Sequence, residues 1–200
     1  MLTKNEYLRQ VFHILVGVAT AITYYYNILS PLAVFIGIIA GGLASLLSKR
    51  VRLPGFSWFL ERFEREEMRK TFPGRGLIFF FIGVLLCMQL FSKDIALAAI
   101  MILALGDSFS HIIGETLGSM NNFFNWKSRK LFEGTLAGFI FGFLGALIFV
   151  PYPEAFLASF AAMVAEVVEI DLNGKHLDDN LIVPLVAGTV ILLVRTYLNF

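Results

Sequence analysis

The chain has 200 residues, of which 58% are hydrophobic, and it carries a formal net charge of +1 at pH 7. Its mean hydropathy of +0.76 leaves too little polar surface to cover a soluble domain of this size. The composition therefore excludes an ordinary soluble protein and predicts a polytopic membrane protein, and the near-neutral charge does not indicate a nucleic-acid partner.

Seven apolar runs approach the length of about 20 residues that a membrane-spanning helix needs. They predict an all-α bundle of about seven transmembrane helices, organised as one integral-membrane domain over residues 1–200. A further segment at 56–70 has aromatic residues at helical spacing against charged ones, which predicts a helix lying on the membrane surface. The predicted spans are Tyr7–Asn27, Ile28–Leu47, Gly76–Phe91, Asp94–Ile112, Gly134–Val150, Ala155–Ile170 and Leu181–Leu198.

The basic residues are distributed unequally between the two sides of these spans. If the N-terminus is cytosolic, only Lys93 and Arg195 of the 16 Lys and Arg fall on the outer side. The positive-inside rule therefore predicts an N-terminus inside and a C-terminus outside. Cys87 is the only cysteine, which excludes an internal disulfide and a thiolate metal site.

Ionisable residues near the first span and the turn before the third span are the first candidates for a site. Arg9 and His13 are four residues apart and share a helix face, although packing is the alternative role for the histidine. The turn Pro73–Gly76 contains Arg75 followed by Gly76, so its backbone could approach a phosphate. The same tetrapeptide is equally typical of a turn with no ligand.

Two carboxylates lie within predicted spans, where an ionisable group is a functional-site hypothesis by default. At 1.5 Å per residue, Asp107 lies about 20 Å from the outer end of its helix, and Glu166 enters to a similar depth. Because Mg²⁺ is bound by one or two carboxylates together with substrate phosphates, Asp107 is a candidate metal ligand. Hydrogen bonding to Ser108 is the structural alternative. Together with His13, these residues predict a polar site that faces the cytoplasm.

The loop before the fifth predicted span is rich in groups that bind phosphate. Lys127, Ser128 and Lys130 are candidates for phosphate contacts, although the positive-inside rule alone would place bases there. The loop ends at Glu133, Gly134 and Thr135, which bring a carboxylate, backbone donors and a hydroxyl to a helix N-terminus that favours phosphate or metal-phosphate. Helix capping by Glu133 is the alternative.

A polar turn before the last predicted span is rich in oxygen ligands. Asp178 and Asp179 could supply a second set of magnesium ligands, and Asp179 and Asn180 could contact a nucleotide. The turn lacks the ligand order and the final glutamate of a calcium-binding loop. The chain also has no Walker-type phosphate loop, no Gly-x-Gly-x-x-Gly, no His-Glu-x-x-His and no nucleophile elbow. A nucleotide site would therefore have to be built from helix ends.

The combination of these motifs resembles the CTP-dependent polyprenol kinases, a family that includes dolichol kinase, phytol kinase and CTP-using diacylglycerol kinases. The resemblance extends from about Arg9 to Leu185 and rests on four segments, which are Phe72–Gly76, Leu105–Ser108, Lys127–Thr135 and Asp179–Leu185. It implies an integral-membrane, multi-pass catalytic domain that transfers the γ-phosphoryl group of CTP to a lipid alcohol at the cytosolic face, with Mg²⁺.

The resemblance also implies roles for individual residues. Asp107 would bind the metal, Lys127 and the Glu133–Thr135 segment would meet the nucleotide phosphates, and Asp179 with Asn180 would complete the site. The family usually runs from Ser128 almost directly to the glutamate, whereas this chain inserts Arg129–Phe132, so Lys127 and Lys130 are both candidates for the phosphate contact. Asp107, Glu166 and His13 are all candidates for the base that accepts the alcohol proton.

Two alternatives stay open at the level of the sequence. Phosphatidate cytidylyltransferases share the Gly-Asp and Lys…Glu-Gly elements, but their long C-terminal signature of charged residues does not occur here. An ion- or proton-coupled transporter would also use acids at membrane depth. The residues alone do not identify the lipid acceptor. They do not indicate the oligomeric state either, because Gly134, Gly138 and Gly142 allow close helix contact within one chain or between subunits.

Overall fold

A computed structural model describes residues 3–51, 53–64, 66–125, 130–168, 171–172 and 175–197. Helices make up most of this part of the chain, and one short ribbon joins β1 and β2 in antiparallel register. The elements are α1 (Lys4–Tyr25), α2 (Pro31–Ser48), α3 (Pro54–Phe63), α4 (Glu66–Thr71), α5 (Arg75–Leu90), α6 (Lys93–Met101), η1 (Ile102–Asp107), α7 (Ser108–Leu117), α8 (Phe132–Ala146), α9 (Tyr152–Val168), β1 (Asp171–Leu172), β2 (Lys175–His176) and α10 (Asp179–Tyr197).

The predicted helical class is confirmed, because each of the seven apolar runs coincides with a helix. Three helices of the described chain are long and apolar enough to cross a membrane, by length and composition alone; they are Pro31–Ser48, Lys93–Leu117 and Asp179–Tyr197. The apolar helices α5 and α8 are shorter. The coarser prediction of a helical membrane protein is therefore supported.

Local sequence signals explain where the first two helices begin. The Thr3 side chain accepts a hydrogen bond from the backbone N–H of Glu6, which satisfies one free donor of the first turn of α1. The Ser30 side chain does the same for Ala33, and Pro31 occupies the first position of α2, where its missing N–H costs nothing. Side-chain caps thus set both starts.

The surface segment 56–70 differs from the single helix that the sequence predicted. It is divided into α3 and α4, because the backbone becomes extended at Glu64, with φ −119° and ψ 145°. The Glu64 carboxylate accepts a hydrogen bond from the backbone N–H of Gly74, ten residues further on. This contact ties the break between the two helices to the turn that precedes α5.

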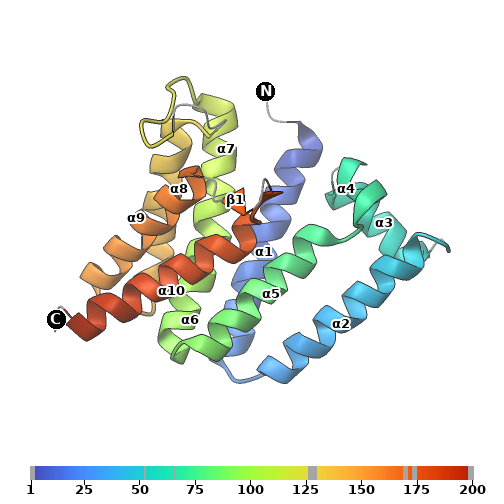
Figure 1. The fold of residues 1–200 in the computed structure, drawn as a ribbon, viewed down its shortest axis with the longest axis horizontal. Helices are drawn as coiled ribbons and strands as arrows, with labels where there is room; N and C mark the ends of the chain where they lie inside the picture. Colours follow the sequence, from blue (N-terminus) through green and yellow to red (C-terminus); the bar gives the residue numbers. More distant parts are fainter. Residues whose placement is uncertain are drawn as a thin grey trace.

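The continuous helix α6–η1–α7 forms the centre of the bundle (Figure 1). Every residue from Ile95 to Ala104 is buried, and η1 contacts α1, α8, α9 and α10. By contrast, α2 lies at one edge of the bundle and exposes large apolar side chains such as Phe35 and Ile39. An exposed apolar helix of this kind fits a lipid environment.

The centre of this long helix has π-helical geometry over Ile102–Asp107, where the sequence predicted an uninterrupted helix. Such wider turns are rare and are frequently found at functional sites. Asp107 is the last residue of the π-helical segment, and α7 begins directly after it. The π-helical turn therefore sets the direction in which the side chain of Asp107 leaves the helix.

Glycines let the helices around this centre approach closely within one chain. A Cβ atom at Gly138 would lie 2.8 Å from the carbonyl oxygen of Gly106, and one at Gly142 would lie 2.7 Å from Ser159 Oγ. A Cβ atom at Gly134 would lie 2.5 Å from the carbonyl oxygen of Ser110. The glycine repeat of α8 therefore packs against neighbouring helices of the same chain.

Gly83→Ala is expected to destabilise the protein, because a Cβ atom there would lie 2.1 Å from the carbonyl oxygen of Asn180. Overpacking against backbone costs about 1–3 kcal/mol, which would lower the midpoint of thermal unfolding. Gly37→Ala is the matched control, because nothing lies within 4 Å of a Cβ atom at that helical position. If both substitutions left the midpoint unchanged, the close contact of α5 with the start of α10 would be wrong.

Candidate functional site

A cavity of about 750 Å³ opens among α1, α3, α4, the starts of α5 and α10, and the junction of η1 with α7. Its walls come from segments that are far apart in the sequence. The residues lining it are Arg9, Gln10, Phe12, His13, Val16, Phe59, Phe63, Glu64, Met68, Gly74, Arg75, Gly76, Leu77, Phe80, Asp107, His111, Leu177, Asp178, Asp179 and Asn180.

One wall of the cavity is apolar and aromatic. The ring of Phe12 lies 5.2 Å from that of Phe59 and 4.6 Å from that of Phe63, measured between centroids. Met68 lines the same region. Because α3 and α4 supply part of this wall, the amphipathic surface segment closes the cavity on the side of its apolar face.

Another part of the lining contains Asp107 between two imidazoles. Its carboxylate oxygens lie 3.9 Å from His13 Nε2 and 3.7 Å from His111 Nε2. Both distances exceed those of normal hydrogen bonds, so the three groups surround a shared space. His111 did not emerge from the sequence analysis, although its position four residues after Asp107 places both on one helix face.

A buried charge cluster lies beside this group. Lys130 Nζ lies 2.8 Å from Glu166 Oε1 and 2.7 Å from Asp179 Oδ2, and the side chain of Glu166 is only 1% exposed. Burial disfavours the charge on Lys130, but the carboxylates of Glu166 and Asp179 outweigh it and raise the pKa of the ammonium group. The raised pKa favours the charged form of Lys130 beside these two carboxylates.

A second basic residue organises the start of α10. The Nε–H group of Arg75 donates to Asp178 Oδ2 at 3.2 Å, and Asn180 Nδ2 donates to the other oxygen of Asp178 at 2.9 Å. These contacts join the turn before α5 to the turn before α10. Three predicted site residues are thus brought together at the cavity.

Several polar atoms around the site are buried without a hydrogen bond to any described residue. They are His13 Nε2, Glu166 Oε2 and Asn180 Oδ1. An unsatisfied polar atom costs free energy and requires an explanation such as a bound ion or ligand. His13 and Asn180 line the cavity, so their unsatisfied atoms support a polar ligand there.

The structure groups potential metal ligands differently from the sequence prediction. Atoms of Asp107, His111 and Glu166 lie within 4.8 Å of one another, so they could hold one ion. Asp178 and Asp179, which were predicted as metal ligands, have Arg75 and Lys130 as their basic partners. Their assignment to a metal stays a prediction.

Not every predicted nucleotide residue lies on the cavity wall. The Glu133 carboxylate accepts hydrogen bonds from the backbone and hydroxyl of Ser119 at 2.9 and 2.8 Å. The Thr135 hydroxyl accepts one from Asn122 at 2.7 Å, and Gly134 packs against α7. Glu133 and Thr135 thus join the start of α8 to Ser119 and Asn122, and the contact of all three residues with a nucleotide stays a prediction.

The remaining predicted residues divide into two groups. Gly76 lines the cavity beside Arg75, as a phosphate-binding turn would require. Lys127 and Ser128 lie outside the described residues. Of the two lysines that were candidates for the phosphate contact, Lys130 is therefore the one whose neighbours are known.

The chain is similar in sequence to several known proteins. An uncharacterized protein of Methanocaldococcus jannaschii is 30% identical over 192 residues, which cover 94% of this chain and 93% of that protein. CTP-dependent diacylglycerol kinase 1 of Eremothecium gossypii is 28% identical over 160 residues, covering 76% of this chain and 48% of the kinase. The Saccharomyces cerevisiae protein of the same name is 28% identical over 158 residues, covering 76% and 52%.

This chain therefore spans about half the length of those two fungal kinases. No family model matches the chain. No solved structure matches it either.

Proposed function

We propose that this chain, which belongs to the same family as the Methanocaldococcus jannaschii protein and is homologous to CTP-dependent diacylglycerol kinases, is a CTP-dependent lipid kinase. It would transfer the γ-phosphoryl group of CTP to the hydroxyl of a membrane lipid alcohol. The homology supports the coarse class, a CTP-dependent lipid kinase. Two acceptors are proposed: a polyisoprenoid alcohol such as dolichol, polyprenol or phytol, after the polyprenol kinases that the motifs resemble, and diacylglycerol, after the names of the fungal relatives.

The observation that carries this proposal is the two-sided cavity. Its aromatic wall of Phe12, Phe59 and Phe63 suits the chain of a lipid, and its polar wall holds Asp107 and Arg75. A lipid alcohol has the same division, because its hydroxyl is polar and its tail is apolar.

The basic groups account for binding of a polyphosphate. Arg9 and Arg75 line the cavity, and Lys130 lies against Asp179, which also lines it. Guanidinium groups match phosphate oxygens in geometry and charge. In our proposal these residues hold the phosphates of CTP near the end of the aromatic wall.

The carboxylates fit a magnesium-nucleotide complex. Asp107 and Glu166 offer oxygens within reach of one ion, and Glu166 Oε2 makes no hydrogen bond to a described residue. Mg²⁺ typically takes one or two carboxylates together with substrate phosphates. When bound there, Mg²⁺ would neutralise charge on the phosphates of CTP.

The proposed reaction is a displacement at the γ-phosphorus. The oxygen of the alcohol forms a bond to that phosphorus, the bond to the β,γ-bridging oxygen breaks, and CDP leaves. The proton of the alcohol passes to a base, for which His13 and the Asp107 carboxylate, 3.9 Å apart, are the candidates. Because positioning and electrostatics dominate phosphoryl transfer, the chain needs to hold the hydroxyl and the phosphate in line.

The membrane orientation belongs to the same proposal. We propose seven spans, formed by α1, α2, α5, α6–η1–α7, α8, α9 and α10, with the N-terminus in the cytosol. The distribution of Lys and Arg supports this topology. The cavity would then open toward the cytosol, where CTP is available. Labelling of single cysteines placed in the loops of a Cys87→Ser protein would test the orientation.

The direct test uses purified protein with CTP labelled at either the γ or the α position. The acceptors are polyprenol, diacylglycerol and phosphatidate, each assayed separately. We expect γ label in the lipid fraction, with the preferred acceptor identifying the substrate, and no transfer when EDTA removes Mg²⁺. Label from the α position would indicate a cytidylyltransferase, and no transfer of either label would contradict the proposal.

A further inference from the structure

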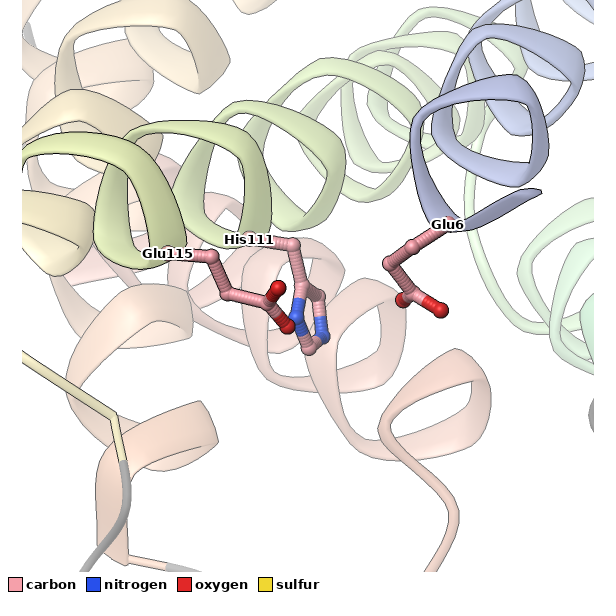
Figure 2. Close-up of side chains that lie close together, drawn as sticks. All are labelled: Glu6, His111 and Glu115. Atoms are coloured by element: carbon pink, nitrogen blue, oxygen red, sulfur yellow. The ribbon is translucent and has the colours of Figure 1, made fainter. Parts of the chain in front are cut away.

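A second group of metal-ligating side chains lies where α1 begins and α7 ends, and the kinase reaction uses none of its carboxylates. It consists of Glu6, His111 and Glu115, which each offer one ligand atom within 4.8 Å of the others. In Figure 2, the imidazole of His111 lies between the two carboxylates. Glu6 comes from one helix, and the other two residues come from another.

The helix geometry explains why these side chains converge. His111 and Glu115 are four residues apart, so they project from the same face of α7. Glu6 lies in the first turn of α1, and α1 packs against α7. The three groups therefore rest on two helices that the fold already holds together.

The set of ligand types indicates which cations would bind. An imidazole nitrogen with carboxylate oxygens suits Zn²⁺, Fe²⁺ and related first-row ions, whereas Mg²⁺ prefers oxygen ligands alone. Glu115 is exposed, so an ion can reach the group from solvent. Glu6 also accepts hydrogen bonds from Arg9 and Gln10, but a carboxylate has about four acceptor directions and can share them.

We propose that Glu6, His111 and Glu115 form a binding site for a first-row transition metal of the Zn²⁺ type. The metal would link the start of α1 to the end of α7. Since α1 carries Arg9 and His13, and Asp107 lies directly before α7, the link would fix two walls of the cavity relative to each other. The site is separate from the magnesium-nucleotide site in its carboxylates and in its cation.

A second group of possible metal ligands shares one residue with the proposed site. His111 also belongs to the group formed with Asp107 and Glu166, so a substitution of His111 would affect both. Glu6 and Glu115 belong only to the proposed site, and Glu166 belongs only to the other. Substitutions of these glutamates therefore show whether the metal binds with Glu6 and Glu115 or with Glu166.

The test measures metal binding to the full chain in detergent, after treatment with a chelator and without nucleotide. Zn²⁺ is titrated by calorimetry, and Co²⁺ is titrated by its visible absorption. We expect one ion per chain for the unmodified protein. Loss of one ligand should weaken binding by about tenfold or more in Glu115→Gln and in Glu6→Gln.

Glu61→Gln is the matched control, because Glu61 is an exposed carboxylate on α3 outside both groups. The affinity of this variant for Zn²⁺ should equal that of the unmodified protein. Circular dichroism and thermal unfolding would confirm that each variant is folded. Unchanged affinity in Glu115→Gln, loss of binding in Glu166→Gln alone, equal competition by Mg²⁺, or no binding of Zn²⁺ would each overturn the proposal. Since no nucleotide is present, these outcomes do not depend on the kinase function.

Discussion

Asp107→Asn is expected to lower phosphoryl transfer from CTP by about a hundredfold to a thousandfold, the cost typical of losing one preorganised electrostatic group. The substitution keeps the size of the side chain but removes its negative charge. It would weaken the binding of a cation and change the polar surroundings of His13 and His111, whose Nε2 atoms lie 3.9 and 3.7 Å from this carboxylate. The measurement is the turnover number with γ-labelled CTP at saturating lipid.

Glu61→Gln is the control for this experiment, because it makes the same change of charge on the exposed face of α3, outside the cavity-lining residues. Thermal unfolding without nucleotide should show whether Asp107→Asn is folded. Stabilisation by CTP with Mg²⁺ should be reduced in Asp107→Asn and retained in the control. Full turnover and normal CTP stabilisation in Asp107→Asn would mean that the cavity is not the active site.

Lys130→Met is expected to lower the free energy of unfolding by about 3–5 kcal/mol, because it leaves buried carboxylates without their cation. Glu166 is 1% exposed and Asp179 is 35% exposed, so Glu166 should account for most of the loss. Met keeps an unbranched apolar side chain of similar size and removes the ammonium group, with its charge and its hydrogen bonds to Glu166 and Asp179. Denaturant unfolding in detergent, followed by circular dichroism, would measure the change.

The double variant Lys130→Met with Glu166→Gln should recover most of this stability, since it removes the uncompensated charge together with its partner. Lys49→Met is the control, because Lys49 donates to the backbone oxygen of Thr71 at an exposed position. If Lys130→Met were as stable as the control, the cluster of Lys130, Glu166 and Asp179 would be incorrectly described.

The helices could be predicted from the sequence because membrane-length apolar runs leave few other structures available to the backbone. The predicted span Asp94–Ile112 lies within one continuous helix, Lys93–Leu117. The break at Glu64 could not be predicted, since it coincides with a hydrogen bond to Gly74, ten residues away. The π-helical turn could not be predicted either, because the apolar residues of this segment are equally typical of a regular helix.

The sequence also identified part of the candidate site. Asp107 and His13 were singled out as ionisable residues of predicted spans and Arg75 as part of a possible phosphate-binding turn, and all three line the cavity. The pairing of Lys130 with Glu166 was beyond the sequence, because 36 residues separate them and only the packing of α9 brings them together. The aromatic wall could not be predicted from the sequence either, because nothing distinguishes Phe59 and Phe63 from the other apolar residues of the chain.

The π-helical turn at Ile102–Asp107 has a consequence for the alignment of residues along the central helix. A π-turn accommodates one more residue than an α-turn, and each residue of an α-helix rotates the chain by about 100°. The residues of α7 are therefore rotated relative to the positions that a regular α-helix continuing from α6 would give them, and both Asp107 and His111 line the cavity. The π-helical turn thus separates the buried part of the central helix, which packs against its neighbours, from the part that contributes Asp107 and His111 to the cavity.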